Sequence, residues 1–150
     1  MAVEDTARSA PGPPAGSHYV ARRPAQGHVV ALMDGGVERR GFQLVGYPTR
    51  GLRAGELHEL IVTDEPGLGT DARIDRVAYQ GFVEITQAGI AVRGDRLIVG
   101  GQEVGVLVGF DECHMPNHLN IIVYNADRRG GRSRGLALGD PAVFQPPAGP

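Results

Sequence analysis

Residues 89–110 read GIAVRGDRLIVGGQEVGVLVGF, and this stretch decides the fold class. Three short apolar runs within it are separated by two turn signals, Arg93-Gly94-Asp95 and Gly100-Gly101. A Gly-Gly pair between apolar runs is typical of a tight β-hairpin, because glycine adopts the left-handed backbone conformations that such turns need. The stretch therefore predicts consecutive antiparallel strands joined by short turns.

Similar apolar runs bounded by Gly, Pro or Asp recur along the rest of the chain. They cover residues 28–33, 42–47, 56–63, 74–86, 118–124 and 136–144. Gly81 lies inside the longest run and predicts a bulge or a sharp bend. Eight or so strands at spacings of about 8–12 residues predict an all-β fold, a single small closed or nearly closed antiparallel β-barrel. Only residues 50–59 and 70–76 could be helical, and both segments would be short.

The chain length and composition favour one domain. With 150 residues the chain can bury one substantial core, and 23 glycines argue against long helices. We expect a disordered leader over residues 1–16, a barrel domain over residues 17–144 and a disordered tail over residues 145–150, because both ends are rich in Pro, Ala and Gly.

The charged residues and the cysteine exclude several classes of function. All 15 basic residues are arginine, so Schiff-base and P-loop lysine chemistry is excluded. A net charge of -2 offers no basic surface to nucleic acid or to a membrane. One cysteine and no apolar signal segment predict a cytoplasmic protein. Arginine in place of lysine is typical of a GC-rich bacterial genome.

The residues from Asp111 to Asn120 form the strongest candidate site. They hold the single cysteine, Cys113, together with His114, His118, Glu112 and Asn117. Pro116 makes a helix through this stretch improbable, so we expect His114 on a loop and His118 at the start of the strand. On that strand His118 and Asn120 share one face, while the opposite face is uniformly apolar. The alternative is a polar turn held by side-chain hydrogen bonds.

A second candidate is the Glu56-Leu57-His58 segment at the start of an apolar strand. Alternation along a strand places Glu56 and His58 on one face, which makes His58 the residue that we expect to meet His118 inside the barrel. His58, His114 and His118 would then form the ligand set for a single divalent metal ion such as Zn²⁺, Fe²⁺ or Mn²⁺. The alternative is an exposed or hydrogen-bonded His58 and no metal at all.

Three further features have both a functional and a structural interpretation. Cys113 could be a nucleophile with His118 as its base, or a small buried apolar side chain. Arg76 and Tyr79 could bind the substrate, or lie on a solvated sheet face. The arginine-rich run 128–134 could close over an anionic ligand, although such a run is more often a solvated loop.

These features predict an enzyme that acts on a small molecule in bacterial, and in particular specialised, metabolism. We expect general acid–base chemistry from His118 and His58, assisted by Glu56, Glu112 or His114. The side chains expected to bind the substrate are Asn117, Asn120, Asp111, Arg76 and Tyr79. An isomerase, cyclase, lyase or dehydratase fits best, because no nucleotide-binding motif is present.

Two alternatives to an enzyme remain open at this point. One is a non-catalytic β-barrel that binds or carries a small ligand with the same polar side chains. The other is a structural protein that assembles through its sheet edges, and in either case the chain could form a homodimer.

One part of the chain resembles a known family. The segment Gly94 to Gly101, with residues 106–109 and 117–123, is similar to a module of the small β-barrel of the glucitol/sorbitol-specific phosphotransferase IIA proteins. The resemblance covers about a third of the chain and implies a small β-barrel. That family's catalytic histidine lies in an aromatic-Ile-His pattern that is missing here, so the resemblance implies no activity.

Overall fold

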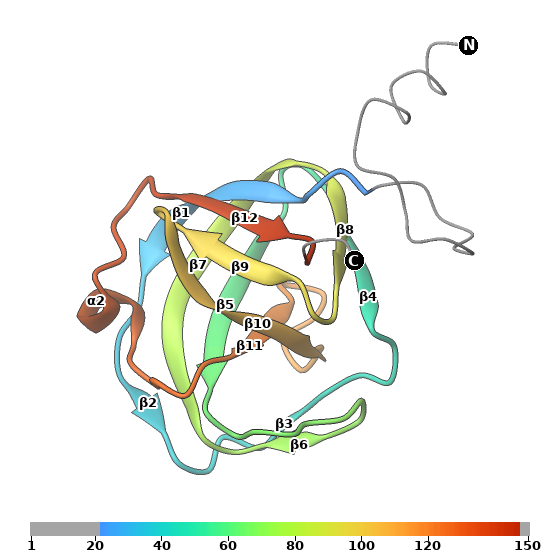
Figure 1. Cartoon of the computed structure of the whole chain (residues 1–150), viewed down its shortest axis with the longest axis vertical. Coiled ribbons are helices and arrows are strands. Elements are labelled where there is room, and N and C mark those ends of the chain that lie inside the picture. Colours follow the sequence, from blue (N-terminus) through green and yellow to red (C-terminus); the bar gives the residue numbers. More distant parts are fainter. Residues whose placement is uncertain (1–21, 148–150) are drawn as a thin grey trace.

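The computed structural model describes residues 22–147, and strands dominate this part of the chain (Figure 1). The helical content of the described residues is the single turn α2 (Gly131–Arg134). The strands are β1 (Gln26–Leu32), β2 (Gly36–Val37), β3 (Phe42–Gln43), β4 (Thr49–Leu52), β5 (Leu57–Thr63), β6 (Arg73–Ile74), β7 (Val77–Gln87), β8 (Gly89–Val92), β9 (Arg96–Val99), β10 (Gln102–Asp111), β11 (Asn120–Tyr124) and β12 (Pro141–Gln145).

Seven of these strands form a nearly closed barrel, which confirms the predicted fold class (Figure 1). The order around the barrel is β1-β12-β9-β10-β11-β5-β7, and β7 pairs back onto β1. Closure of this kind leaves few backbone groups on exposed edges. The remaining strands form two small sheets, β3–β6 and β4–β8, and β2 extends the sheet at β7.

One pairing in the barrel departs from the antiparallel prediction. Strand β11 runs parallel to β5, with Asn120 opposite Glu59 and Val123 opposite Val62. The connection between the two strands spans more than fifty residues and includes β7 and β10, as a parallel pair requires a long crossover. This parallel pair decides which side chains meet at the candidate site.

Two apolar cores lie on opposite faces of the β5–β11 pair. The larger core contains Leu60 and Val62 from β5 together with Ile121 from β11. The smaller core contains Ile61 from β5 and Ile122 from β11, whose side chains point to the opposite face. They pack against Phe42, Leu44, Ile74 and Val77. Strands that are buried on both faces carry continuous apolar runs, which explains the sequences Leu60-Ile61-Val62 and Ile121-Ile122-Val123.

Gly81 marks the predicted irregularity in β7. Its φ of 152° is in the region that favours glycine, and a Cβ at this position would overlap the carbonyl oxygen of Ala31 on β1. The register with β5 shifts at the same place, since Leu60 lies opposite Gly81 but Ile61 lies opposite Tyr79. The predicted bulge is therefore confirmed.

The predicted helical segments are wrong. Residues 50–59 contain the end of β4, a turn at Gly55 and the start of β5, and residues 70–76 contain a turn followed by β6. The observed helical turn α2 lies instead in the arginine-rich segment predicted to be a loop, where Gly135 ends it in the left-handed conformation.

The predicted terminal segments are only partly open to comparison. The expected leader, residues 1–16, lies outside the described residues, as do residues 148–150 of the expected tail. Strand β12 includes Gln145, one residue beyond the expected end of the domain. Among residues 22–147, no helix is both long enough and apolar enough to cross a membrane.

Candidate functional site

The loop from Glu112 to Leu119 connects β10 to β11 and lies against the start of β5. The parallel register of β11 with β5 brings this about, because Asn120 lies opposite Glu59 and the residues before Asn120 follow the start of β5. In a parallel pair, residues opposite each other share a face. His118, two residues before Asn120, therefore lies on the face of Glu59 rather than on the face of His58.

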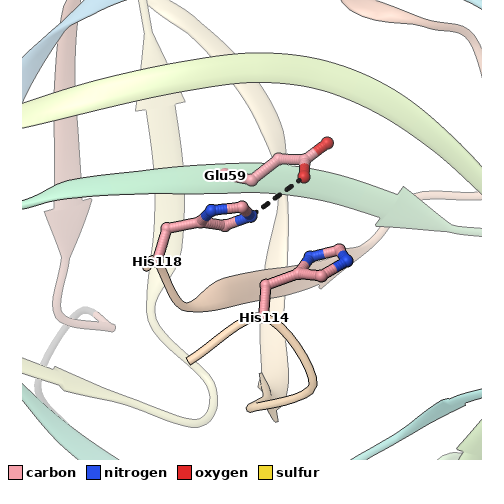
Figure 2. A group of neighbouring side chains, drawn as sticks. All are labelled: Glu59, His114 and His118. Carbon is pink, nitrogen blue, oxygen red and sulfur yellow. Dashed lines mark ion pairs between the residues drawn. The ribbon is translucent and has the colours of Figure 1, made fainter. Parts of the chain in front are cut away.

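Three side chains with metal-ligating atoms converge at this point: Glu59, His114 and His118 (Figure 2). One ligand atom from each residue lies within 4.8 Å of the other two. Glu59 comes from β5, and both histidines come from the loop. Sequence reasoning identified the two histidines but missed Glu59, because alternation along β5 had pointed to its neighbours Glu56 and His58.

His118 is held on two sides, and one of its ring nitrogens has no hydrogen-bonding partner among residues 22–147. Its Nδ1 atom lies 3.0 Å from the Asn117 side-chain amide, and its ring packs edge-on against Phe82 with 5.0 Å between centroids. Its Nε2 atom is buried and lies 3.6 Å from Oε1 of Glu59, too far for a good hydrogen bond. Burial lowers the pKa of His118, and the neighbouring His114 and His58 lower it further.

Glu59 is a buried carboxylate with little compensation. Its side chain is 7% exposed. Among residues 22–147, its carboxylate makes one polar contact, with Nε2 of His118. Burial raises the pKa of Glu59, and electrostatic interaction with the neighbouring His114 and Arg40 offsets this only in part. A buried carboxylate of this kind is costly unless a cation or a set of hydrogen-bond donors stabilises it.

His114 is positioned by a chain of hydrogen bonds that ends at a buried carboxylate. Its Nδ1 atom lies 3.4 Å from Oδ1 and 3.2 Å from Nδ2 of Asn120, and Asn120 Nδ2 donates to Asp111 at 3.0 Å. On the other side of the ring, Arg40 Nη2 lies 3.5 Å from His114 Nε2. Sequence reasoning gave no signal for Arg40, which stacks over the Phe42 ring at 4.2 Å.

Asp111 fixes the start of the loop rather than contacting a pocket. Besides Asn120, it accepts hydrogen bonds from the backbone N–H groups of Gln43 at 2.8 Å and Cys113 at 2.9 Å. Burial would raise the pKa of Asp111, but these hydrogen bonds hold that pKa below its usual value. Asp111 and Asn120 are buried and hydrogen-bonded to each other, which gives both a structural role in the loop, and their expected role in binding a substrate stays a prediction.

His58 is fully engaged by its own hydrogen bonds. The backbone N–H of Leu119 donates to Nδ1 at 3.0 Å, so Nε2 carries the hydrogen and donates to Oε1 of Glu56 at 3.1 Å. The Arg53 backbone N–H also donates to Glu56 Oε1, at 2.9 Å. His58 therefore lies outside the cluster of Glu59, His114 and His118, so the three histidines of the predicted metal set do not converge.

The Glu56 carboxylate is ionised at neutral pH. Partial burial would raise the pKa of Glu56, but the hydrogen bonds from Arg53 and His58 hold that pKa below its usual value. Both hydrogen bonds reach Oε1. The second oxygen, Oε2, is left to accept a proton or a hydrogen bond from a bound molecule.

A pocket of about 300 Å³ lies between the start of β5 and the loop. Glu56 and His58 line one side of it, and Asn117 and His118 line the other. The full lining is Gly55, Glu56, Leu57, His58, Met115, Pro116, Asn117 and His118. His58 and His118 both line this pocket, although their polar partners differ.

The other predicted site residues lie elsewhere. Glu112 accepts hydrogen bonds from Tyr47 and Arg50, both at 2.7 Å. Arg76 pairs with Asp64 at 2.9 Å, and Tyr79 packs against the smaller core. The structure does not bring these residues to the pocket.

Cys113 is exposed, so its expected role as a buried apolar side chain is wrong. Partial burial of the thiol and the nearby Asp111 raise the pKa of Cys113. A raised pKa leaves little thiolate at neutral pH and makes Cys113 a poor nucleophile.

Comparison with known proteins identifies the family of the chain. A family model described as "Family of unknown function (DUF6917)" matches residues 19–145, and the chain belongs to this family. No curated protein and no solved structure matches it.

Proposed function

We propose that the protein is an enzyme of the isomerase, cyclase, lyase or dehydratase type that acts on a small molecule in the pocket between β5 and the 112–119 loop. One observation carries this proposal: the hydrogen-bonded pair of Glu56 and His58 faces Asn117 and His118 across that pocket. Two segments about sixty residues apart in the sequence thus bring ionisable and amide side chains to one place.

The hydrogen bonds favour Glu56 as the group that accepts a proton from the substrate. His58 uses both ring nitrogens, so it orients Glu56 instead of acting as the base itself. Glu56 is ionised and keeps one oxygen free to accept a proton, and because its lowered pKa makes it a weak base, it suits a substrate whose proton is already acidic, such as one next to a carbonyl group. In this proposal Glu56 takes the role of base that was expected of His58, while proton transfer by His118 stays a prediction.

The pocket lining favours an uncharged substrate that has a polar and an apolar part. The side-chain amide of Asn117 can hold a carbonyl or hydroxyl oxygen, while Leu57, Met115 and Pro116 offer apolar surface. Among residues 22–147 no arginine lines the pocket, so this part of the chain offers no guanidinium there to a phosphate or carboxylate. The expected bacterial, cytoplasmic setting stays a prediction.

The proposal is tested by searching for turnover with matched variants. Purified wild-type protein, Glu56→Gln and Glu103→Gln are each incubated with a small-metabolite extract, and the products are followed by chromatography and mass spectrometry. Glu103 is a matched control because it is exposed and lies near the start of β10, whereas the loop follows the last residue of that strand.

We expect at least one metabolite to be converted by the wild type and by Glu103→Gln. Conversion by Glu56→Gln should be slower by about 100-fold or more, as loss of a general base implies. Equal conversion by Glu56→Gln would contradict the role of Glu56. Retention of a metabolite without conversion would instead support a non-catalytic carrier.

A further inference from the structure

We propose that Glu59, His114 and His118 form a binding site for one divalent transition-metal ion, with coordination positions left open for water or a substrate. This site goes beyond the proposed function, because it stands on the geometry of Glu59, His114 and His118, none of which the acid–base proposal uses for proton transfer, although His118 also lines the pocket. The ion would be of the zinc or ferrous type.

The three side chains offer the ligand types that a transition-metal ion prefers. Two imidazoles and one carboxylate are ligands that Zn²⁺ and Fe²⁺ accept, whereas Mg²⁺ and Ca²⁺ prefer oxygen alone. Three protein ligands leave at least one position free, which is typical of catalytic rather than structural sites. One ligand atom from each of the three residues already lies within 4.8 Å of the others.

Two of the three side chains, Glu59 and His118, are buried without adequate polar partners. Within the described part of the chain, His118 Nε2 has no hydrogen bond although it is buried, and it is directed toward Glu59 (Figure 2). The Glu59 side chain is 93% buried, and the polar contact of its carboxylate within residues 22–147 is with the same His118 nitrogen. Unsatisfied buried polar atoms are rare in native proteins and call for a specific explanation. A cation between Glu59 and His118 would satisfy both.

Neighbouring polar residues hold the two histidine rings in place. Asn117 fixes the His118 ring through Nδ1, which leaves Nε2 for the ion. Asn120 and the Asp111 carboxylate hold His114. Histidines that bind metals usually have such a partner on the rest of the ring, because it sets the orientation and tautomer.

Loading requires a small rearrangement at His114. Metal–ligand bonds of about 2.0–2.2 Å demand that the ligand atoms lie closer together than 4.8 Å. His114 has Arg40 at one nitrogen and Asn120 at the other, and the ion takes the place of one of them. Because His114 is on a loop, rotation of its side chain can close the site.

The test is a metal titration of the full-length protein after removal of metal with a chelator. Zn²⁺ binding is measured by competition with a chromophoric chelator, and Co²⁺ serves as a spectroscopic probe of the coordination number. The variants are Glu59→Gln and His114→Ala, with His28→Ala as a control, since His28 is a half-exposed histidine on β1 outside the cluster.

We expect one ion per wild-type chain and per His28→Ala chain. Loss of an outer partner alone costs about 10–100-fold in metal affinity, so Glu59→Gln and His114→Ala should each weaken binding by about 100-fold or more. No saturable binding, or binding that either variant leaves unchanged, would overturn the proposal. His114 is on a loop, so His114→Ala remains informative even where Glu59→Gln fails to fold.

The same variants separate this proposal from the proposed function. Glu56→Gln should bind the metal like the wild type, because Glu56 is not a ligand. If His114→Ala loses the metal but keeps full turnover, the site stands and the ion has no part in the reaction. If Glu56→Gln keeps full turnover while the metal binds as expected, only the proposed function fails.

Discussion

The Oε1 atom of Glu59 lies 3.6 Å from Nε2 of His118, and both side chains are about nine-tenths buried. Glu59 lies on β5 and His118 on the loop before β11, far apart in the sequence. The parallel pairing of β5 with β11 places them together. A buried carboxylate beside an unpartnered imidazole nitrogen is costly to a protein. This relationship points to a function rather than to stability.

Replacement of Glu59 by methionine should therefore not destabilise the metal-free protein. A buried carboxylate without adequate partners is costly, and because the pKa of His118 is lowered, removal of Glu59 leaves a neutral imidazole and no unpaired buried charge. We expect the free energy of unfolding of metal-free Glu59→Met, measured with urea, to equal or exceed that of the wild type. Zn²⁺ should raise the melting temperature of the wild type but not of the variant. A clear loss of stability in the metal-free variant would show that Glu59 is mainly structural.

Asn120 should contribute more to stability than Asn117, although both amides lie near the histidines. Asn120 is fully buried and connects Asp111 to His114, whereas Asn117 is exposed on the loop. Loss of a buried hydrogen-bonding group costs about 1–3 kcal/mol. Asn120→Ala should lower the free energy of unfolding by this amount, while Asn117→Ala should change it by less than about 0.5 kcal/mol. Similar effects of the two variants would contradict the assigned roles.

Much of the barrel was predictable from local patterns, because turns and strands leave local signals. The hairpin at Gly100-Gly101 and the bulge at Gly81 both follow from the conformational freedom of glycine. The failures have physical reasons as well. Residues 50–59 lack helix-breaking prolines, but Gly51 and Gly55 leave too little helix propensity to resist strand pairing.

The candidate site was only half predictable. The loop histidines stand out by composition, whereas Glu59 is one of several charged residues beside an apolar strand. Its role depends on a parallel pairing across more than fifty residues, which no local pattern encodes. The same pairing explains why His118 contacts Glu59, while His58 is fixed by Glu56 and Leu119.

Gly81 should be intolerant of substitution. A Cβ there would overlap the Ala31 carbonyl oxygen, and the backbone conformation is unfavourable for other residues. Gly81→Ala should cost at least about 1–3 kcal/mol, the range for a strained backbone position. Gly51→Ala is the control, since a Cβ at Gly51 meets no atom within 4 Å. Thermal unfolding of the two variants checks this, and equal melting temperatures would refute the account of the bulge.

The ion pair of Arg22 and Asp95 should matter more than that of Arg96 and Glu103. Asp95 is completely buried and receives two hydrogen bonds from Arg22, at 2.6 and 3.0 Å. Removing Arg22 leaves a buried charge, which costs about 3 kcal/mol. Arg96 and Glu103 are both nearly half exposed, so their pair contributes less than about 1 kcal/mol. Urea unfolding of Arg22→Ala and Arg96→Ala should show this difference; equal losses would contradict it.

The most direct test of the site is diffraction from crystals of the zinc-loaded protein, recorded on both sides of the zinc absorption edge. The account predicts one strong anomalous peak per chain, within bonding distance of Glu59, His114 and His118, and no such peak in crystals of His114→Ala. A peak at other residues, or none in zinc-loaded wild-type crystals, would contradict the claim that these three side chains form a metal site.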